Sequence, residues 1–410
     1  MAAALTYAYT GRDGTGKVVK GRVDAPSESS VASRLRTMGI APISIQQVAA
    51  GTGLNRDISL GGLFDKRVTI KDLAVMSRQL ATMIGAGLPL LKALTILASQ
   101  SENPKLAEVI DDVRGSVEEG ATFSDSLAKH PKTFPPIFVN LSRAGEVGGF
   151  LETALESVAK NYEKEVKLKD TIQSALTYPV VVLIMALLAV VGMIVFIVPV
   201  FEDLFSDLGG TLPVPTLILV GISRQMVWLG PLLVVLIVGG ALWWRANRHT
   251  PRFRAWWEPL LLKLPVFGKL FQKIAIARFT RNFGTMIGSG VPILQALSII
   301  GSTSGNWQVE QAVLSVQDSV RQGRTIAAPL ADEPIFPPMV TQMIAVGEDS
   351  GALETMLEKI ADFYDDEVQS TTEQLTSLIE PLMIAFLGVV LGGMIVALYL
   401  PIFDIFNQVQ

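Results

Sequence analysis

Apolar positions follow a helical period through most of the chain beyond residue 67. A stripe spaced i, i+3, i+4 begins after Thr69, which pairs with Asp72 as a capping box. The stripe consists of Leu73, Met76, Leu80, Met83 and Ile84. Further helices are predicted near 104–119, 123–129, 135–144 and 150–176. Because short loops join these helices, the pattern predicts an antiparallel helical bundle.

Three apolar runs without charged residues are long enough to cross a bilayer as helices. Pro179 and Pro199 bracket the first run, Pro381 and Pro401 bracket the third, and the second covers 225–244. A helix needs about 20 apolar residues to cross the hydrocarbon core. The sequence therefore predicts a mainly α-helical, polytopic membrane protein with three transmembrane helices.

The chain contains an internal repeat. The stretch 78–89 returns as 281–292 at an offset of 203, and the glycine-rich stretch 144–152 returns as 346–354 at an offset of 202. The repeat predicts two tandem helical bundles, each followed by a span in the same direction. Such a parallel repeat needs an odd number of crossings between the copies, and the run 225–244 supplies one.

Glycines and prolines are predicted to shape the corners of both copies. Gly87 with Pro89, and Gly290 with Pro292, should end the first helix and begin the second. The second, glycine-rich corner of each copy contains Gly145 and Gly149, or Gly347 and Gly351.

An acidic residue accompanies each glycine-rich corner. It is Glu146 in the first copy and Glu348 in the second. One interpretation places each carboxylate at a helix end in an ordinary helix–helix turn. The other makes it a contact for a partner, and both interpretations remain open at this point.

A small ββαβ module is predicted before the helical region. It consists of strands at 7–9 and 18–23, a helix at 27–38 and a strand at 42–48. The stretch 11–18 resembles a phosphate-binding loop, but Val18 replaces the hydroxyl residue that would hold Mg²⁺. A strand follows it instead of a helix, so a hairpin turn is predicted. Residues 49–66 contain four glycines and are predicted to be a flexible linker.

Composition narrows the function classes. Half of the 410 residues are hydrophobic, 18% are charged and the formal net charge is -4, which gives no argument for nucleic-acid binding. The mean hydropathy of +0.42 fits a few spans joined to sizeable water-facing parts. The chain has no cysteine and two histidines, which excludes disulfides, thiolate metal sites and His-rich metal sites. No cofactor is expected, and no signal peptide is recognised at the N-terminus.

Charges beside the spans predict the topology. Four lysines precede the first span and three acids follow it, at Lys160, Lys164, Lys167, Lys169, Glu202, Asp203 and Asp207. Positive charge marks the cytoplasmic flank, so the N-terminus and both bundles should be cytoplasmic and the C-terminus outside. Arginines and tryptophans within 245–270 could also suggest RNA binding. Because they abut a span, they are predicted to form a belt at the inner membrane face instead.

These patterns divide the chain into ten parts. They are an N-terminal α+β module (1–48), a linker (49–66), a first bundle (67–176), a first span (177–201), an outer loop (202–216), a second span (217–244), a basic and aromatic inner connector (245–270), a second bundle (271–379), a third span (380–403) and an outer C-terminal tail (404–410).

The repeat, the proline brackets and the three spans together resemble one family. The combination is similar to the type II secretion system F proteins (GspF/PilC), which form the inner-membrane assembly platform of type IV pili and secretion pseudopili. The resemblance covers nearly the whole chain and includes 78–89, both glycine corners and 175–179. Thr171 departs from the family pattern, which usually has a basic or amide residue at the membrane entry.

The resemblance implies a non-enzymatic scaffold. Its expected partners are a cytoplasmic hexameric ATPase, pilins or pseudopilins, other inner-membrane assembly proteins and further copies of the chain. Motion of the ATPase would pass through the bundles and bring pilins from the membrane into the filament. Glu146 and Glu348 are the residues expected to contact the ATPase or the sister bundle.

Two other classes of function compete with the scaffold: a small-solute transporter built as a three-span oligomer, and a membrane-anchored enzyme. The first and third spans contain no ionisable residue, whereas a transport path would normally need some. No nucleophile–base pair or metal cluster is apparent in the sequence. These observations favour the scaffold independently of the resemblance.

Overall fold

The computed structural model describes residues 5–12, 18–25, 28–37, 39, 41–47, 67–207, 212–248, 250–265 and 267–408. The chain divides into two compact units, Met1–Asp65 and Lys66–Gln410. The predicted linker 49–66 and the centre of the predicted hairpin turn, 13–17, lie outside the described residues.

The first unit is a three-stranded antiparallel sheet with one helix. Strands β1 (Leu5–Arg12), β2 (Val18–Ala25) and β3 (Ala41–Gln47) lie in the order β2-β1-β3, and α1 (Glu28–Thr37) precedes β3. Val31 and Leu35 of α1 are fully buried beside Tyr7 of β1. The predicted ββαβ order is confirmed. A strand follows residue 17 and pairs with β1, which is the context of a hairpin and not of a phosphate-binding loop.

The second unit begins with a bundle of six helices. They are α2 (Ile70–Gly85), α3 (Leu90–Gln100), α4 (Pro104–Glu118), α5 (Phe123–Ala128), α6 (Pro136–Gly148) and α7 (Leu151–Gly192). The predicted capping box is present, since Thr69 and Asp72 exchange backbone-to-side-chain hydrogen bonds at the start of α2. Leu80 and Phe138 are fully buried in the core of this bundle.

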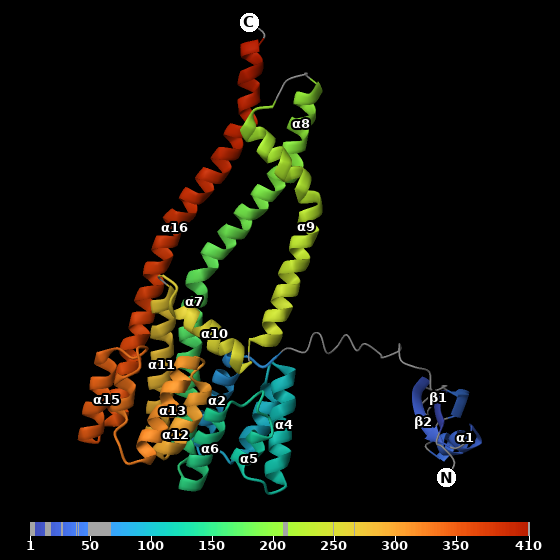
Figure 1. The fold of residues 1–410 in the computed structure, drawn as a ribbon. Coiled ribbons are helices and arrows are strands. Elements are labelled where there is room, and N and C mark those ends of the chain that lie inside the picture. The colour runs from blue at the N-terminus through green and yellow to red at the C-terminus, as the bar shows by residue number, and fades with distance from the viewer. Residues whose placement is uncertain are drawn as a thin grey trace. The chain divides into compact units, whose positions relative to one another are not determined.

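A second bundle repeats the first. Its helices are α11 (Phe267–Gly288), α12 (Ile293–Thr303), α13 (Trp307–Arg321), α14 (Ala327–Ala331), α15 (Pro338–Ser350) and α16 (Leu353–Gln408). The two bundles lie against each other and share one hydrophobic core, which includes Leu155 and Tyr162 of the first and Phe279 and Leu357 of the second. The internal repeat therefore corresponds to two copies of one folded unit (Figure 1).

Among the described residues, three helices are long and apolar enough to cross a membrane. The candidate spans lie within Leu151–Phe205, Trp228–Asn247 and Leu353–Pro401. They belong to α7, to α9 (Val214–Asn247) and to α16, which extend away from the bundles in Figure 1. Their apolar side chains face outward, as Phe196 (73% exposed) and Val389 (76% exposed) do, and lipid would cover such surfaces. The chain is a mainly α-helical, multi-pass membrane protein.

Helix ends differ from the predicted limits of the spans. α7 runs without a break from the bundle into the first span, and α16 does the same in the second copy. The predicted outer loop 202–216 is helical as far as Asp207, at the end of α8 (Val198–Asp207), and again from Val214. Hydropathy marks where a bilayer would begin, whereas hydrogen bonding decides where a helix ends, so the two limits need not coincide.

The proline at the end of the first span leaves a backbone carbonyl without its usual donor. A π-helical stretch, η2 (Met193–Ile197), precedes Pro199, and within it the N–H of Val198 bonds to the carbonyl of Met193. The same five-residue pairing would join Ile194 to Pro199, which has no N–H. The hydroxyl of Ser223 on α9 donates to the Ile194 carbonyl at 2.7 Å.

In the third span, too, a hydroxyl of α9 bonds to a carbonyl that a proline leaves without a donor. Pro401 lies inside α16, so the carbonyl four residues earlier, at Ala397, has no backbone donor. The hydroxyl of Thr216 on α9 donates to it. Thr216 and Ser223 are two turns apart and both are buried. Hydroxyls on one face of α9 therefore bond to the free carbonyls of both other spans. Unpaired carbonyls are costly in hydrocarbon, which explains why a middle helix carries these two hydroxyls.

Removing both hydroxyls should loosen the three spans. The double variant Thr216→Val and Ser223→Ala is expected to lower stability by about 1–2 kcal/mol, since interhelical hydrogen bonds in membranes are worth about 0.6 kcal/mol on average. Thermal unfolding in detergent would measure this. Thr177→Val is the control, because its hydroxyl bonds within its own helix, to the carbonyl of Gln173. Equal stabilities of the double variant and the wild type would contradict this account of α9.

Candidate functional site

The first corner of each bundle is formed by a glycine with a left-handed backbone and a proline. Gly87 has φ +79° and Gly290 has φ +72°, a conformation that costs other residues energy. Pro89 and Pro292 follow as the N-cap residues of α3 and α12.

The glycine-rich corner needs glycine for two separate reasons. Gly149 and Gly351 cap α6 and α15 with φ +72° and +70°. Gly145 is helical, but a Cβ there would lie 2.5 Å from the Cβ of Ala154 on α7. A Cβ on Gly347 would likewise lie 3.0 Å from the Cα of Leu353. Helices α6 and α7 therefore approach too closely for any side chain at this corner.

Glu146 and Glu348 are engaged within the chain. The carboxylate of Glu146 accepts hydrogen bonds from the N–H of Phe123 at 2.7 Å and of Ser124 at 3.1 Å, and from the Ser124 hydroxyl at 2.8 Å. These are donors at the first turn of α5, where a negative charge is favourable. Each carboxylate thus joins the glycine corner to a short helix about 22 residues earlier in the chain.

The second copy repeats this bond network. Glu348 accepts from the N–H of Ile326 at 2.9 Å and from the N–H of Ala327 at 3.4 Å, at the start of α14. Both glutamates are half-buried. The contact of Glu146 and Glu348 with a partner stays a prediction, whereas their role as caps is visible in both copies.

An arginine joins the first and last helices of each bundle. Arg78 of α2 binds Glu163 of α7 through two parallel hydrogen bonds of 2.6 and 2.7 Å and Glu156 at 2.5 Å. The hydrogen bonds from Arg78 lower the pKa of both carboxyl groups. In the second copy Arg281 binds Asp365, at the position equivalent to Glu163. This arginine begins the repeated stretch 78–89, and its ion pairs explain why both copies have an arginine at this position.

Polar pairs join the two bundles. Asn161 of α7 donates to Asn282 of α11 at 2.9 Å, and Lys164 of α7 lies 2.9 Å from Asp362 of α16. Glu165 of α7 also forms an ion pair with Arg278 of α11. We call this contact of α7 with α11 and α16 the inter-bundle junction. Gln295 of α12 also donates to Asn140 of α6 at 3.2 Å, which is a further polar pair between the bundles.

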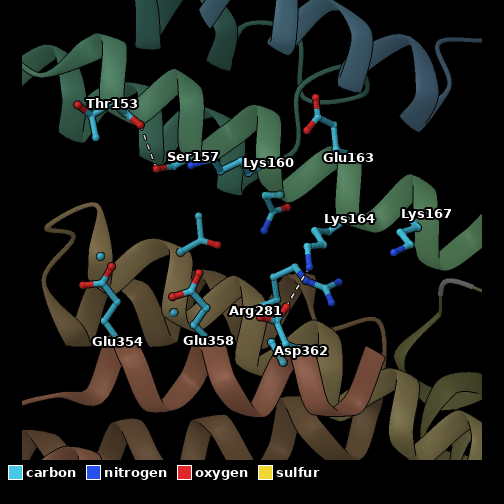
Figure 2. A pocket seen from close by; sticks show the side chains of 15 residues that line it. Thr153, Ser157, Lys160, Glu163, Lys164, Lys167, Arg281, Glu354, Glu358 and Asp362 are labelled. Carbon is cyan, nitrogen blue, oxygen red and sulfur yellow. Dashed lines mark hydrogen bonds and ion pairs between the residues drawn. The ribbon is translucent and has the colours of Figure 1, made fainter. Parts of the chain in front are cut away.

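A cleft of about 520 Å³ opens beside the junction. Figure 2 shows Lys160, Lys164 and Lys167 on α7 facing Glu354, Glu358 and Asp362 on α16. Arg281 is buried at the floor, and its Nη1 has no hydrogen-bond partner among the described residues. The cleft walls thus have opposite charges, and salt weakens the attraction between them where the side chains are exposed.

The cleft has no recognisable catalytic arrangement. Within the described ranges no group of three or more His, Asp or Glu side chains could hold a metal ion. The hydroxyls of Thr153 and Ser157 line it, and Ser157 donates to the carbonyl of Thr153 in its own helix at 2.9 Å. The charged side chains of the cleft are suited to holding α7 beside α16, as the Lys164–Asp362 ion pair does.

The basic and aromatic connector forms a helix that rests on the second bundle. Arg254 of α10 (Pro251–Leu262) pairs with Glu258 at 2.9 Å and with Glu310 of α13 at 2.9 Å. Trp244 contacts Trp257 edge to face with ring centroids 4.8 Å apart. Trp256 is 65% exposed. The aromatic side chains gather where α9 meets α10, and their place at the inner membrane face stays a prediction.

The four bracket prolines occupy equivalent places in long helices. Pro179 lies inside α7 and Pro199 inside α8, while Pro381 and Pro401 lie inside α16. They therefore do not end the helices that cross the candidate membrane region.

Fold and site together define a class: multi-pass membrane proteins in which two copies of a helical bundle are joined by long helices to three spans. The family model for the type II secretion system (T2SS), protein F, matches residues 76–199 and 279–401, one match for each copy. The model for the N-terminal domain of the same protein matches residues 1–46.

Curated relatives agree over the full length. The chain is 42% identical to the type IV pilus assembly protein PilC of Myxococcus xanthus, over 100% of this chain and 97% of that protein. It is 42% identical to the PilC protein of Thermus thermophilus, over 98% of this chain and 99% of the relative. The type II secretion system protein F of Vibrio cholerae is 32% identical, over 98% of each chain. The chain belongs to the type II secretion system protein F family, which includes PilC proteins.

Proposed function

We propose that this chain is a non-enzymatic inner-membrane platform for assembling type IV pili or type II secretion pseudopili. Relatives with full-length similarity carry the names of both systems. In this proposal a cytoplasmic hexameric ATPase acts on the bundles, and the chain passes the motion to pilins or pseudopilins in the membrane. Other inner-membrane assembly proteins and further copies of the chain complete the platform.

The observation that carries the proposal is the continuity of α7 and α16. Each helix begins in the core of a bundle, at Leu151 or Leu353, and continues into a candidate span. A continuous helix transmits a tilt or rotation along its length, because its backbone hydrogen bonds resist bending. Movement imposed on a bundle would therefore reach the membrane through two parallel levers.

The contacts of the bundles support transmission of movement without a reaction catalysed by this chain. The bundles meet through a shared hydrophobic core as well as through ion pairs beside a polar cleft. Within each bundle, Arg78 or Arg281 ties the first helix to the last. Because a close-packed core transmits displacement, the two bundles are expected to move together and to pass that movement to α7 and α16.

The test of this function is recovery of the assembly ATPase with the full-length chain from native membranes. We expect the hexameric ATPase to co-purify, and the purified chain alone to show no turnover and no solute flux in vesicles. Specific flux of a solute would contradict the platform and favour the transporter alternative.

We also propose that both bundles are cytoplasmic and that the C-terminus is outside. Lysines beside the first span and acids beyond it support this orientation. The chain has no natural cysteine, so Asn407→Cys provides a single labelling site at the end of α16. An impermeant maleimide added to intact cells or spheroplasts should label it, and Lys160→Cys should be labelled only after lysis. The reverse pattern would show the opposite topology.

A further inference from the structure

The inter-bundle junction uses surfaces that the repeat duplicates. On the first copy, α7 contributes Asn161, Lys164 and Leu168, of which Asn161 and Leu168 are buried. On the second copy, α11 and α16 provide the surface that receives them. Leu168 packs there against Leu270, Val368 and Leu375.

An equivalent face exists on α16 and is exposed. At the offset of 202, the residues equivalent to Asn161, Lys164, Leu168 and Ile172 of α7 are Phe363, Asp366, Ser370 and Gln374. All four of these α16 side chains are exposed, and Phe363 is 45% exposed. Phe363 is thus an exposed apolar side chain on this face, whereas the equivalent face of α7 is covered at Asn161 and Leu168.

The receiving surface is also duplicated, and on the first copy it is open. A groove of about 730 Å³ runs between α2 and α7. Its lining includes Val75, Gln79, Glu163 and Val166. These are the residues equivalent to Arg278, Asn282, Asp365 and Val368, which receive α7 on the second copy. The groove is therefore the receiving surface of the junction without its helix.

The two duplicated surfaces also have complementary charges. Lys164 pairs with Asp362 within the chain. The residue equivalent to Lys164 is Asp366, and the residue equivalent to Asp362 is Lys160. The equivalent pair therefore also has one positive and one negative member, with the signs exchanged. Glu163, which lies near this position in the groove, is already neutralised by Arg78.

Lys160 precedes Glu163 by three residues on α7, about one turn from the groove lining, and its Nζ lies 3.7 Å from Glu156. An ion pair would therefore form again if the α16 face entered the groove and Lys160 turned from Glu156 toward Asp366.

We propose that the α16 face containing Phe363 and Asp366 docks in the α2–α7 groove of a second copy of this chain. The contact repeats the inter-bundle junction, with Phe363 beside Gln79 and Asp366 beside Lys160. The contact joins different surfaces of the two copies, so the interface is heterologous. An assembly built from it is closed only if the copies form a ring. Since all copies span one membrane, the ring axis lies along the membrane normal, and first and second bundles alternate around it.

This contact is weaker than the junction within the chain. Ser370 and Gln374 replace Leu168 and Ile172, so less apolar surface is buried. A weaker second contact lets the ring open and close while each chain keeps its two bundles together. The inference deepens the proposed function, because it rests on the chain acting as a homo-oligomer and names the surfaces involved.

Cysteine cross-linking tests the contact in the full-length chain in membranes, without the ATPase. One chain carries Gln79→Cys and a co-expressed chain with a different tag carries Phe363→Cys; the absence of natural cysteine removes background. Oxidation should join the two tags in one covalent dimer. Asn161→Cys with Asn282→Cys in a single chain is the positive control and should be joined within that chain by oxidation or by a short bis-maleimide reagent, because Nδ2 of Asn161 lies 2.9 Å from Oδ1 of Asn282.

Each other cross-linking result contradicts the proposal. Phe363→Cys joined to itself would indicate a symmetric interface. A product between Gln79→Cys and Leu54→Cys of the same chain, with no product to Phe363→Cys, would mean that the chain's own N-terminal segment fills the groove. No product with Gln79→Cys, when the positive control forms, would also overturn it.

Charge reversal provides an independent measurement on the same cross-link. Lys160→Glu or Asp366→Lys alone should reduce the cross-linked fraction about fivefold, and combining them should restore it. The positive control pair should be unaffected by Asp366→Lys, because Asp366 does not line the inter-bundle cleft. Loss of ATPase binding with an intact cross-link would contradict the proposed function alone, whereas loss of the cross-link with intact ATPase binding would contradict this inference alone.

Discussion

Gly145→Ala is expected to lower the stability of the full chain by about 1–3 kcal/mol, because its Cβ cannot be accommodated without moving a helix. The added carbon would lie 2.5 Å from the Cβ of Ala154 and 3.0 Å from the Cα of Leu151. Neither neighbour is the flexible end of a long side chain, so α6 and α7 must separate. Thermal unfolding of the purified chain in detergent would show a lowered Tm.

A matched substitution should have the opposite effect. Gly115 also lies inside a helix, α4, but a Cβ there would meet nothing within 4 Å. Gly115→Ala is expected to stabilise the chain by about 0.5–1 kcal/mol, from helix propensity alone. If both variants changed Tm in the same direction, the close approach at Gly145 would not be the reason for glycine there. Gly347→Ala should repeat the result of Gly145→Ala in the second bundle.

Replacing both corner glutamates should destabilise both bundles. In Glu146→Ala the first two N–H groups of α5 lose their acceptor, and in Glu348→Ala the N–H groups of Ile326 and Ala327 at the start of α14 lose theirs. Leaving half-buried donors unpaired costs about 1–3 kcal/mol in each bundle. Unfolding of the single and double variants, measured alongside recovery of the ATPase, would separate this role from partner binding.

Amide variants and a neighbouring acid make the separation sharper. Glu146→Gln and Glu348→Gln each keep an acceptor oxygen and should keep most of the stability. If the carboxylates only cap helices, ATPase recovery should follow stability. Recovery lost in the Glu146→Gln and Glu348→Gln variants with an unchanged Tm would assign both residues to the partner. Asp349→Ala, at the exposed position beside Glu348, is the control for a general loss of negative charge.

Patterns that act over a few residues predicted the elements well. The capping box of Thr69 and Asp72 and the prolines that begin α3 and α12 depend on near neighbours in sequence. The repeat predicted two equivalent folded copies, because a duplicated apolar pattern buries equivalent faces. Hydropathy predicted three spans, and three helices have the required length and composition.

Contacts between distant residues could not be predicted in the same way. Glu146 caps a helix that begins 23 residues earlier, at Phe123, and nothing in the local pattern specifies that donor. Asn161 and Asn282 are 121 residues apart and meet only because two bundles pack in one orientation. Ser223 resembles an ordinary polar residue near the end of a span in the sequence. Its partner is a carbonyl freed by a proline on another helix.

The long helices relate the fold to the proposed platform. The bundle and the span of each copy share one continuous helix, so the division predicted at 176/177 falls inside α7. Helix α9 adds a third connection, because Thr216 and Ser223 hold it to the other two spans. Movement of either bundle would therefore act on all three spans together.

The central claim is that this chain connects a cytoplasmic ATPase to filament assembly without catalysing a reaction. Recovery of the hexameric ATPase with the tagged, full-length chain from native membranes tests it most directly. The account predicts that the ATPase is recovered with the wild type and with Gly115→Ala. A folded wild-type chain recovered repeatedly without the ATPase would contradict it.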